Sequence, residues 1–415
     1  MRKVLAVLAT AGVVMAVTSV AGATARRDDS AVSKDEIKVG ITYVDLAPVR
    51  AAGINRDHGD YEKTWRTVID DLNKRGGVNG RKIVPVFAGV NPIGTDPAQV
   101  ACVKLSQDDK VFAVMGQTFG ADGPMCYVEQ QDMPLLGGSI TTEGLSRAKA
   151  PWYTLERSSG DLATMMDAFA ADGQFKKKTV GVVAAATDQT LTEDVVLPAL
   201  AKNKVKPKTV AYTNSPNDDI PAQRAEMDTI IKRLQADKVD TVVTVEGSIP
   251  LLAGRLAETD YRPTILSTSN ANVQSYANTA GNDTSPLKGL VAGDVSYPYD
   301  EPSLAKCRDM VAKATGETMV ETPTPGSPSY RTSAEIACRY TALFAQLAGA
   351  AGKTPTAAGL AKAGKKLGTV TVPGSGTIAY NAKTKTFEQP VYLFRFDPAT
   401  GTQVRDPQPY QPASK

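Results

Sequence analysis

The sequence predicts an α/β fold made of two doubly wound lobes, each built on a parallel sheet. Short β-rich runs alternate along the chain with amphipathic stretches, which is the pattern of parallel α/β sheets. The β-rich runs are almost continuously apolar, as expected for strands that helices cover on both faces. They form two sets of four with similar spacing, which favours two sheets over one large one.

The predicted strands and helices follow one another in a regular order. The strands of the first set begin at Ile37, Ile83, Val111 and Pro134, and those of the second set begin at Thr179, Thr209, Asp240 and Thr264. The apolar face of the first helix consists of Tyr61, Trp65, Val68, Ile69 and Leu72. A second helix is predicted from Pro97, because Asp96 is a suitable N-cap and proline suits the first helical position.

The stretch DDLNKRGGVNGRKI, residues 70–83, joins the first helix to the second strand. Gly76 and Gly77 can adopt the left-handed backbone that closes a helix. Asn79-Gly80 predicts a tight turn into the strand. These glycines are therefore expected to be structural, at the end of the sheet opposite to a ligand site.

The C-terminal third departs from the strand and helix alternation. The segment 152–161 connects the two predicted sets of strands, and the segment 290–300 follows the second set. Two long helices are predicted after it, over 303–316 and 333–351. The last segment, GTIAYNAKTKTFEQPVYLFRF, predicts a β-hairpin with its turn at Asn381 to Lys385.

The N-terminus has the layout of a secretory signal peptide, residues 1–25. Arg2 and Lys3 precede an apolar run, Val4 to Val20, and small residues follow up to Ala25. A membrane anchor is the alternative, but the run is short and contains threonine and glycine. We therefore predict export to the periplasm or the cell surface, without a cysteine near the cleavage site for lipid attachment.

Charge and cysteine content further limit the possible partners and covalent cross-links of the protein. The chain has 47 Lys+Arg against 44 Asp+Glu, which argues against a nucleic-acid partner. Four cysteines in an exported chain predict two disulfides, for which three pairings are possible. We favour Cys102–Cys126 and Cys307–Cys338, because each pair lies on successive predicted helices. A zinc site would need closer spacing.

Candidate ligand-binding residues follow the predicted strands. In open parallel sheets, ligands bind beyond the carboxyl ends of the strands, where helix N-termini offer free N–H groups. The side chains expected there are those of Tyr43, Thr118, Phe119, Ser139, Thr141, Asp188, Gln189, Glu246 and Ser269. For each of them, helix capping or turn formation is the alternative role.

Nothing in the sequence predicts catalysis or a cofactor. The chain has one histidine, His58, in a polar loop, and it lacks the G-x-S-x-G motif of serine hydrolases. Paired acids such as Asp70-Asp71 fit a helix face, and no metal-ligand spacing occurs. We predict a binding protein rather than an enzyme.

Several segments together resemble a known family. Asn73 to Ile83, followed by DPAQVACVKL, VFAVMG and MPLLGGSITTE, resembles type I periplasmic solute-binding proteins of the Leu/Ile/Val-binding branch, which serve ABC transporters. The resemblance implies two lobes joined by three crossover segments, a small-molecule ligand captured by domain closure, a membrane permease as partner and a monomer. The implied lobes are 37–156 with 297–370, and 157–296 with 371–415. An extracellular sensor of the same fold is the alternative function.

The resemblance also suggests how a ligand would be held. Thr118, Ser139 and Thr141 fit the hydroxyls that bind the ligand carboxylate in amino-acid binders. Their ligand ammonium meets an acid after the last strand of lobe two, where this chain has Thr268-Ser269-Asn270 and no acid. Glu246, with Asp188 behind it, is the nearest substitute. The alternative is that Glu246 pairs with a base such as Arg255 and does not meet the ligand.

Overall fold

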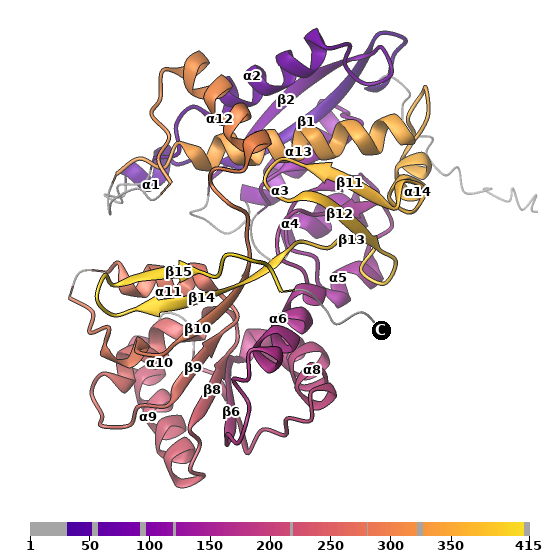
Figure 1. The fold of residues 1–415 in the computed structure, drawn as a ribbon. Coiled ribbons are helices and arrows are strands. Elements are labelled where there is room, and N and C mark those ends of the chain that lie inside the picture. The colour runs from indigo at the N-terminus through magenta and orange to yellow at the C-terminus, as the bar shows by residue number, and fades with distance from the viewer. Residues whose placement is uncertain are drawn as a thin grey trace, which may run out of the picture.

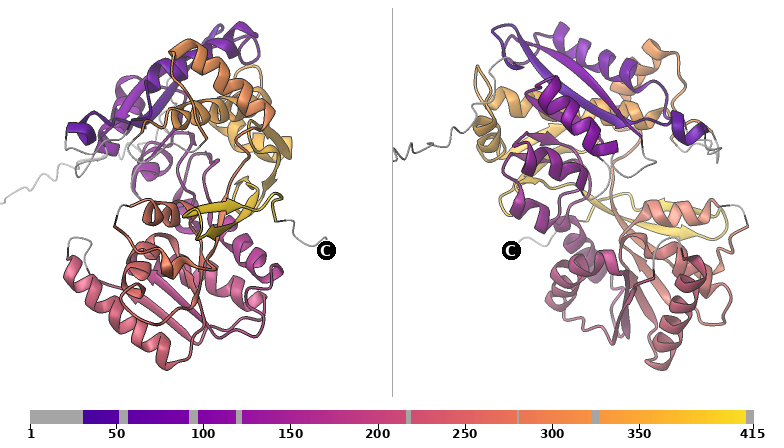
Figure 2. Two further views of the ribbon diagram at one scale, coloured as in Figure 1. Left: turned by 60° about the vertical axis from the view of Figure 1, so that its left-hand side comes forward. Right: turned by 180° about the vertical axis from the view of Figure 1, so that it is seen from behind.

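The computed structural model describes residues 31–51, 57–91, 97–118, 122–215, 219–279, 281–321 and 327–410. They form two lobes, one above the other in Figure 1, each with its own sheet. Figure 2 shows the same two lobes from two further sides. The predicted signal peptide and Phe119 lie outside the described residues.

Lobe one, the upper part of Figure 1, is built on a five-stranded parallel sheet. In spatial order its strands are β2 (Lys82–Val90), β1 (Glu36–Val44), β3 (Ala113–Gly116), β4 (Leu135–Leu136) and β5 (Trp152–Tyr153). The four strands predicted from the first set are confirmed. The fifth, β5, lies at the start of the segment that was expected to be only a connection.

Helices cover both faces of the lobe-one sheet. Those that contribute to the core on one face are α1 (Ala47–Ala51), α2 (Tyr61–Lys74), α12 (Pro302–Thr315), α13 (Arg331–Ala350) and α14 (Ala357–Leu367). On the other face lie α3 (Pro97–Val103), η2 (Lys104–Asp108), α4 (Asp122–Met125), η3 (Cys126–Gln130) and α5 (Thr142–Arg147). This double cover fits the predominantly apolar sequences of the strands.

Lobe two has a seven-stranded sheet, five strands of which are parallel. Its spatial order is β15 (Thr402–Arg405), β14 (Val391–Asp397), β10 (Val291–Val295), β9 (Thr264–Ser267), β8 (Thr241–Thr244), β6 (Val180–Ala185) and β7 (Thr209–Thr213). The last two strands of the chain, β14 and β15, join antiparallel at one edge.

Helices also cover both faces of the lobe-two sheet. One face carries α9 (Ile220–Ala236), α10 (Ile249–Leu256) and α11 (Asn270–Ala277). The other carries α6 (Ser159–Ala171) and α8 (Leu197–Lys202), with short turns η4 (Ala186–Asp188), α7 (Gln189–Leu191) and η5 (Thr192–Val196) before α8. Two further short turns, η6 (Glu246–Ser248) and η7 (Ser285–Leu287), complete the lobe.

A small third sheet corrects the predicted lobe boundary at residue 371. It consists of β11 (Thr369–Val372), β12 (Gly376–Asn381) and β13 (Thr386–Phe387), all antiparallel. Val372, Ile378 and Phe387 are buried in the same core as α2 and α13, so this segment packs on lobe one. The β12–β13 hairpin is the predicted one, but the strand after it, β14, pairs with β10 in lobe two instead of extending the hairpin.

The glycine-rich turn after α2 has the predicted form. Gly76, Gly77, Asn79 and Gly80 all have positive φ angles, and α2 ends at Lys74. A Cβ atom on Gly77 would lie 1.9 Å from the Arg81 carbonyl oxygen. Only glycine therefore fits at this position.

Both disulfides pair as predicted. Cys102 of α3 bonds to Cys126 of η3, and Cys307 of α12 bonds to Cys338 of α13. Both lie in lobe one, where each joins two neighbouring helical segments. No helix in the described parts of the chain has the length and apolar character needed to cross a membrane.

Three connections link the lobes, at residues 154–158, 296–301 and 388–390. The backbone N–H of Ser296 donates to the Pro390 carbonyl at 3.2 Å, so the second and third connections lie side by side. The Thr154 N–H donates to the Thr386 hydroxyl at 2.9 Å, which holds the first connection against β13. The third connection was expected near Val372, but Val372 is fully buried in lobe one.

Candidate functional site

The two parallel sheets have the same winding, which places their switch points at equivalent positions. The order β2-β1-β3-β4-β5 in lobe one matches β7-β6-β8-β9-β10 in lobe two. In each sheet the strand order reverses beside the first strand, between β1 and β3 and between β6 and β8. Ligands of doubly wound folds bind at such points, beyond the carboxyl ends of the strands.

The carboxyl ends of both sheets lie toward the gap that the connections span. The first connection leaves the carboxyl end of β5, and the second leaves the carboxyl end of β10. Arg157, in the first connection, contacts Glu246 after β8 and Asp294 in β10. The first connection therefore lies against the predicted binding residue Glu246 of lobe two.

In lobe one, the three predicted hydroxyl residues share a cavity of about 460 Å³. Thr118, Ser139 and Thr141 line it together with Trp152 and Glu156. The Thr141 hydroxyl also accepts from the Gly144 N–H at 3.0 Å and caps α5, so it has a local role as well. The three residues come together because they follow the neighbouring strands β3 and β4.

The charged residues that line this cavity, Glu143, Arg147 and Glu156, were not identified as site residues from the sequence. Glu156 lies just after β5. Its carboxyl interacts with the backbone N–H of Gly138 and with the Ser139 hydroxyl, and burial raises its pKa. Arg339 of α13 lies close enough to oppose that rise in pKa. The available signal was its position, an acid just after the last strand of the lobe.

Tyr43 lies outside this cavity. It borders a smaller cavity of about 160 Å³ with Asp45, Arg50 and Tyr61. Its hydroxyl donates to Glu62 at 3.0 Å, and its ring stacks on Tyr61 at 5.3 Å. Tyr43 is therefore held by α2.

In lobe two, Glu246 is the best-placed of the predicted residues. It has a left-handed backbone (φ 49°), which is uncommon for a residue other than glycine and is characteristic of functional sites. Its N–H donates to the Thr268 hydroxyl at 2.9 Å. Burial raises its pKa to about 7; Arg157 opposes this shift, and Asp188 and Asp294 add to it.

The partner of Glu246 is Arg157, and the suggested pairing with Arg255 is wrong. Arg255 pairs with Asp228 at 2.7 Å and with Glu258 at 2.5 Å. Arg157 donates to the Thr268 carbonyl at 2.6 Å, pairs with Glu246 and lies 3.5 Å from Asp294. These partners lie far from Arg157 along the chain, so the arrangement could not be predicted from local sequence patterns.

The other predicted lobe-two residues are mainly engaged locally. The Gln189 amide donates to Glu193 at 2.9 Å on an exposed surface. Ser269 is 2% exposed and caps α11 by accepting from the Asn272 N–H at 3.3 Å. Asp188 is half-buried, and burial raises its pKa although the positive charge of Arg157 opposes the rise. Asp188 therefore lies near Arg157.

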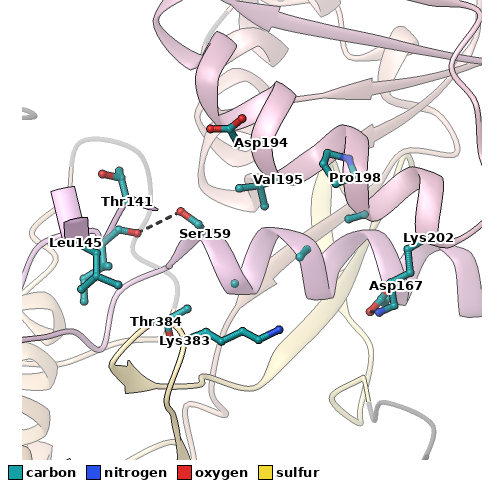
Figure 3. Close-up of a pocket in the computed structure, with 14 residues that line it drawn as sticks. Thr141, Leu145, Ser159, Asp167, Asp194, Val195, Pro198, Lys202, Lys383 and Thr384 are labelled. Carbon is teal, nitrogen blue, oxygen red and sulfur yellow. Dashed lines mark hydrogen bonds and ion pairs between the residues drawn. The ribbon is translucent and has the colours of Figure 1, made fainter. Parts of the chain in front are cut away.

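A third cavity, of about 480 Å³, has walls from both lobes. Figure 3 shows Thr141 and Leu145 of lobe one facing Ser159, Val195 and Pro198 of lobe two. The hairpin turn with Lys383 and Thr384 lies along the same cavity. Its walls would move relative to one another in any rotation of the lobes.

The acidic residues of the site are not arranged to hold a metal ion. Within the described ranges, no group of three or more His, Cys, Asp or Glu side chains is gathered closely enough for this.

Comparisons with known proteins agree with this architecture. The family model described as periplasmic binding protein matches residues 36–402. No curated protein matches the sequence.

Solved structures share the fold at low sequence identity. An ABC transporter substrate-binding protein from Desulfitobacterium hafniense, in complex with Leu, has a TM-score of 0.63 at 12% identity, over 90% of this chain and 100% of that one. A fatty acid ABC transporter substrate-binding protein from Thermomonospora curvata has a TM-score of 0.62 at 17% identity, over 92% and 94%. A solute-binding protein from R. palustris in complex with 4-hydroxybenzoate has a TM-score of 0.61 at 13% identity, over 90% and 96%. Because the family model covers nearly the whole chain, this protein belongs to the periplasmic binding protein family.

Proposed function

We propose that this protein is the exported solute-binding component of an ABC importer. It captures a small polar solute between the lobes, closes on it and delivers it to a membrane permease. The observation that carries this proposal is a pair of lobes whose sheets have the same winding, with a cavity lined by residues of both lobes between them. The solved structures with this fold include substrate-binding proteins of ABC transporters.

The residues we propose for ligand contact are Thr118, Ser139 and Thr141 in lobe one, and Asp188 and Glu246 in lobe two. The first three border one cavity, and the last two lie beside Arg157. Burying charged side chains at strand ends costs free energy of folding. The presence of Asp188, Glu246 and Arg157 there therefore favours a role in ligand binding.

A thermal-shift screen of the mature protein tests the proposal. The panel contains amino acids, amines, amides, polyamines, aromatic acids and sugars. A solute that binds the folded state raises the melting temperature, by an amount that grows with its concentration. If no solute class raises the melting temperature at millimolar concentration, the proposed function is wrong.

A further inference from the structure

We propose that lobe one has a second ligand site, which takes a small aromatic carboxylate. The site is a cavity of about 670 Å³ where three helices of lobe one meet, α2, α12 and α13, in the upper part of Figure 1. A cavity of this size is typical of sites for small organic molecules. The described residues that line it all belong to lobe one and differ from those proposed for solute contact. The existence of this site therefore does not depend on the proposed function.

The walls of this cavity are mainly apolar and contain several sulfur atoms. Val68 and Leu72 of α2 line it, and so does Met310 of α12. The Cys307–Cys338 disulfide, which joins α12 to α13, lines the same cavity. Sulfur atoms make favourable contacts with aromatic rings. Three of them around one cavity favour an aromatic ligand over an aliphatic one.

A buried hydroxyl group without a hydrogen-bond partner belongs to the same cavity. Thr341 of α13 lines it and is 4% exposed, and its Oγ1 has no partner among the described residues. On other helices, the hydroxyls of Thr67 and Thr315 donate to the carbonyl four residues earlier. The Thr341 hydroxyl makes no such bond within the described residues. It is therefore available to a ligand oxygen, which would remove the cost of leaving it unpaired.

The ionisable side chains of the cavity leave one positive charge unmatched. Arg75 pairs with Asp71 at 2.9 Å, one turn away on α2. Lys306 of α12 is exposed, lines the cavity and has no ion-pair partner in the described parts of the chain. Glu301, the N-cap of α12, lies outside the lining and accepts from the Gly374 N–H at 2.8 Å. A negatively charged group of a ligand would therefore be attracted to Lys306.

The disulfide brings the free hydroxyl and the free ammonium close to each other. Lys306 precedes Cys307, Thr341 lies one turn after Cys338, and the two cysteines are bonded. One carboxylate can thus accept from the Thr341 hydroxyl and face Lys306, while the ring attached to it covers the sulfur atoms. A carboxylate is the organic group that fits both partners, because it accepts hydrogen bonds and carries negative charge.

Ligands that share a carbon skeleton test the chemical class. We would titrate the mature protein by calorimetry with 3-phenylpropanoate, 3-phenylpropylamine, 3-phenylpropanol and 3-cyclohexylpropanoate. We expect 3-phenylpropanoate to bind most tightly, because it alone combines an aromatic ring with a carboxylate. The amine, which Lys306 repels, should bind about fivefold more weakly or worse. Absence of 3-phenylpropanoate binding at millimolar concentration, or equal or tighter binding of any of the other three, would overturn the inference.

Variants of the lining residues test the location of the site. Ala345→Phe places a ring in the cavity and should abolish binding of 3-phenylpropanoate. Lys306→Gln should weaken it by about two- to fivefold, as expected for an exposed ion pair. Lys313→Gln is the matched control, because Lys313 is another exposed lysine of α12 but lies outside the lining, and its affinity should not change. Unchanged affinity in Lys306→Gln would overturn the inference, and this surface change keeps the test valid if Ala345→Phe does not fold.

Thr341→Val distinguishes ligand binding from packing. Valine keeps the shape of threonine but has no hydroxyl, so the empty variant should melt at a higher temperature than wild type because a buried unpaired group is gone. The same change should weaken 3-phenylpropanoate binding at least about tenfold, because a hydrogen bond to a charged group is lost. Unchanged affinity in the folded variant would show that Thr341 only packs in the core, and would overturn its assignment to the site.

Discussion

At the residue scale, the site depends on two neighbouring residues that bind to opposite lobes. Glu156 interacts with Ser139 in lobe one, whereas Arg157 pairs with Glu246 in lobe two. The positions of Ser139 after β4 and of Glu246 after β8 were predicted correctly, because this prediction needs only the position of each strand along the chain. It did not reveal Arg157, whose partners Glu246 and Thr268 lie 89 and 111 residues away.

Glu246 should also make folding stability depend on pH. Its pKa rises from 4.5 to about 7 on folding, so the folded protein holds this proton more tightly than the unfolded chain does. Between about pH 4.5 and 7, the free energy of unfolding should therefore fall as pH rises, by up to about 3 kcal/mol from this group. Glu246→Gln removes this contribution.

Urea unfolding of the empty protein across this pH range measures the effect. The stability of Glu246→Gln relative to wild type should increase from pH 4.5 to pH 7. Parallel stability curves for the two proteins would show that Glu246 does not titrate as proposed.

At the scale of elements, the order of strands and helices was predictable from the sequence, but the core against which each segment packs was not always predictable. All eight predicted parallel strands are present, because strands buried on both faces have an unmistakably apolar sequence. The strands β4 and β5 are both only two residues long, but β4 lies in the apolar run MPLLGG, whereas polar residues follow β5 directly and hide its pattern. The segment 371–387 was assigned to the wrong lobe because a local hairpin pattern does not say which core it covers.

The turn after α2 gives a prediction on a single glycine. Gly77→Ala should lower the free energy of unfolding by about 2 kcal/mol or more, because the left-handed backbone costs about 1–2 kcal/mol and the added Cβ collides with the Arg81 carbonyl. Gly173 is the matched control: its φ is +80°, and a Cβ there has no neighbour within 4 Å. Denaturant unfolding should show a smaller loss for Gly173→Ala, and equal losses would contradict the steric argument.

The Cys307–Cys338 bond should stabilise the packing of α12 on α13. It closes a loop of 31 residues, for which loop-closure entropy gives about 3.5 kcal/mol. Replacing both cysteines with serine should lower the stability by roughly that amount. Non-reducing peptide mapping checks the connectivity, and a link between Cys102 and Cys307 would disprove it.

At the scale of the whole molecule, the connections show where the lobes can rotate. Thr154 bonds to Thr386 of lobe one and Arg157 pairs with Glu246 of lobe two, so we expect the first connection to bend between residues 154 and 157. In the third connection, Gln389 accepts from Arg339 of lobe one at 3.0 Å, whereas Val391 begins a strand of lobe two. We therefore expect this connection to bend at Pro390, whose carbonyl accepts from Ser296 of the second connection.

Rotation about these points should close the cleft when a solute binds. A solute held by the proposed ligand-contact residues of lobe two gains further contacts if Thr118 and Thr141 approach from lobe one. Closure also excludes water, which strengthens each polar contact. Small-angle X-ray scattering should therefore give a smaller radius of gyration with the solute that causes the largest thermal shift. Glu246→Gln, at the same solute concentration, should keep the larger radius because it binds more weakly. An unchanged profile of the wild-type protein at saturation would mean that the solute binds without closure, and that the three connections do not act as a hinge.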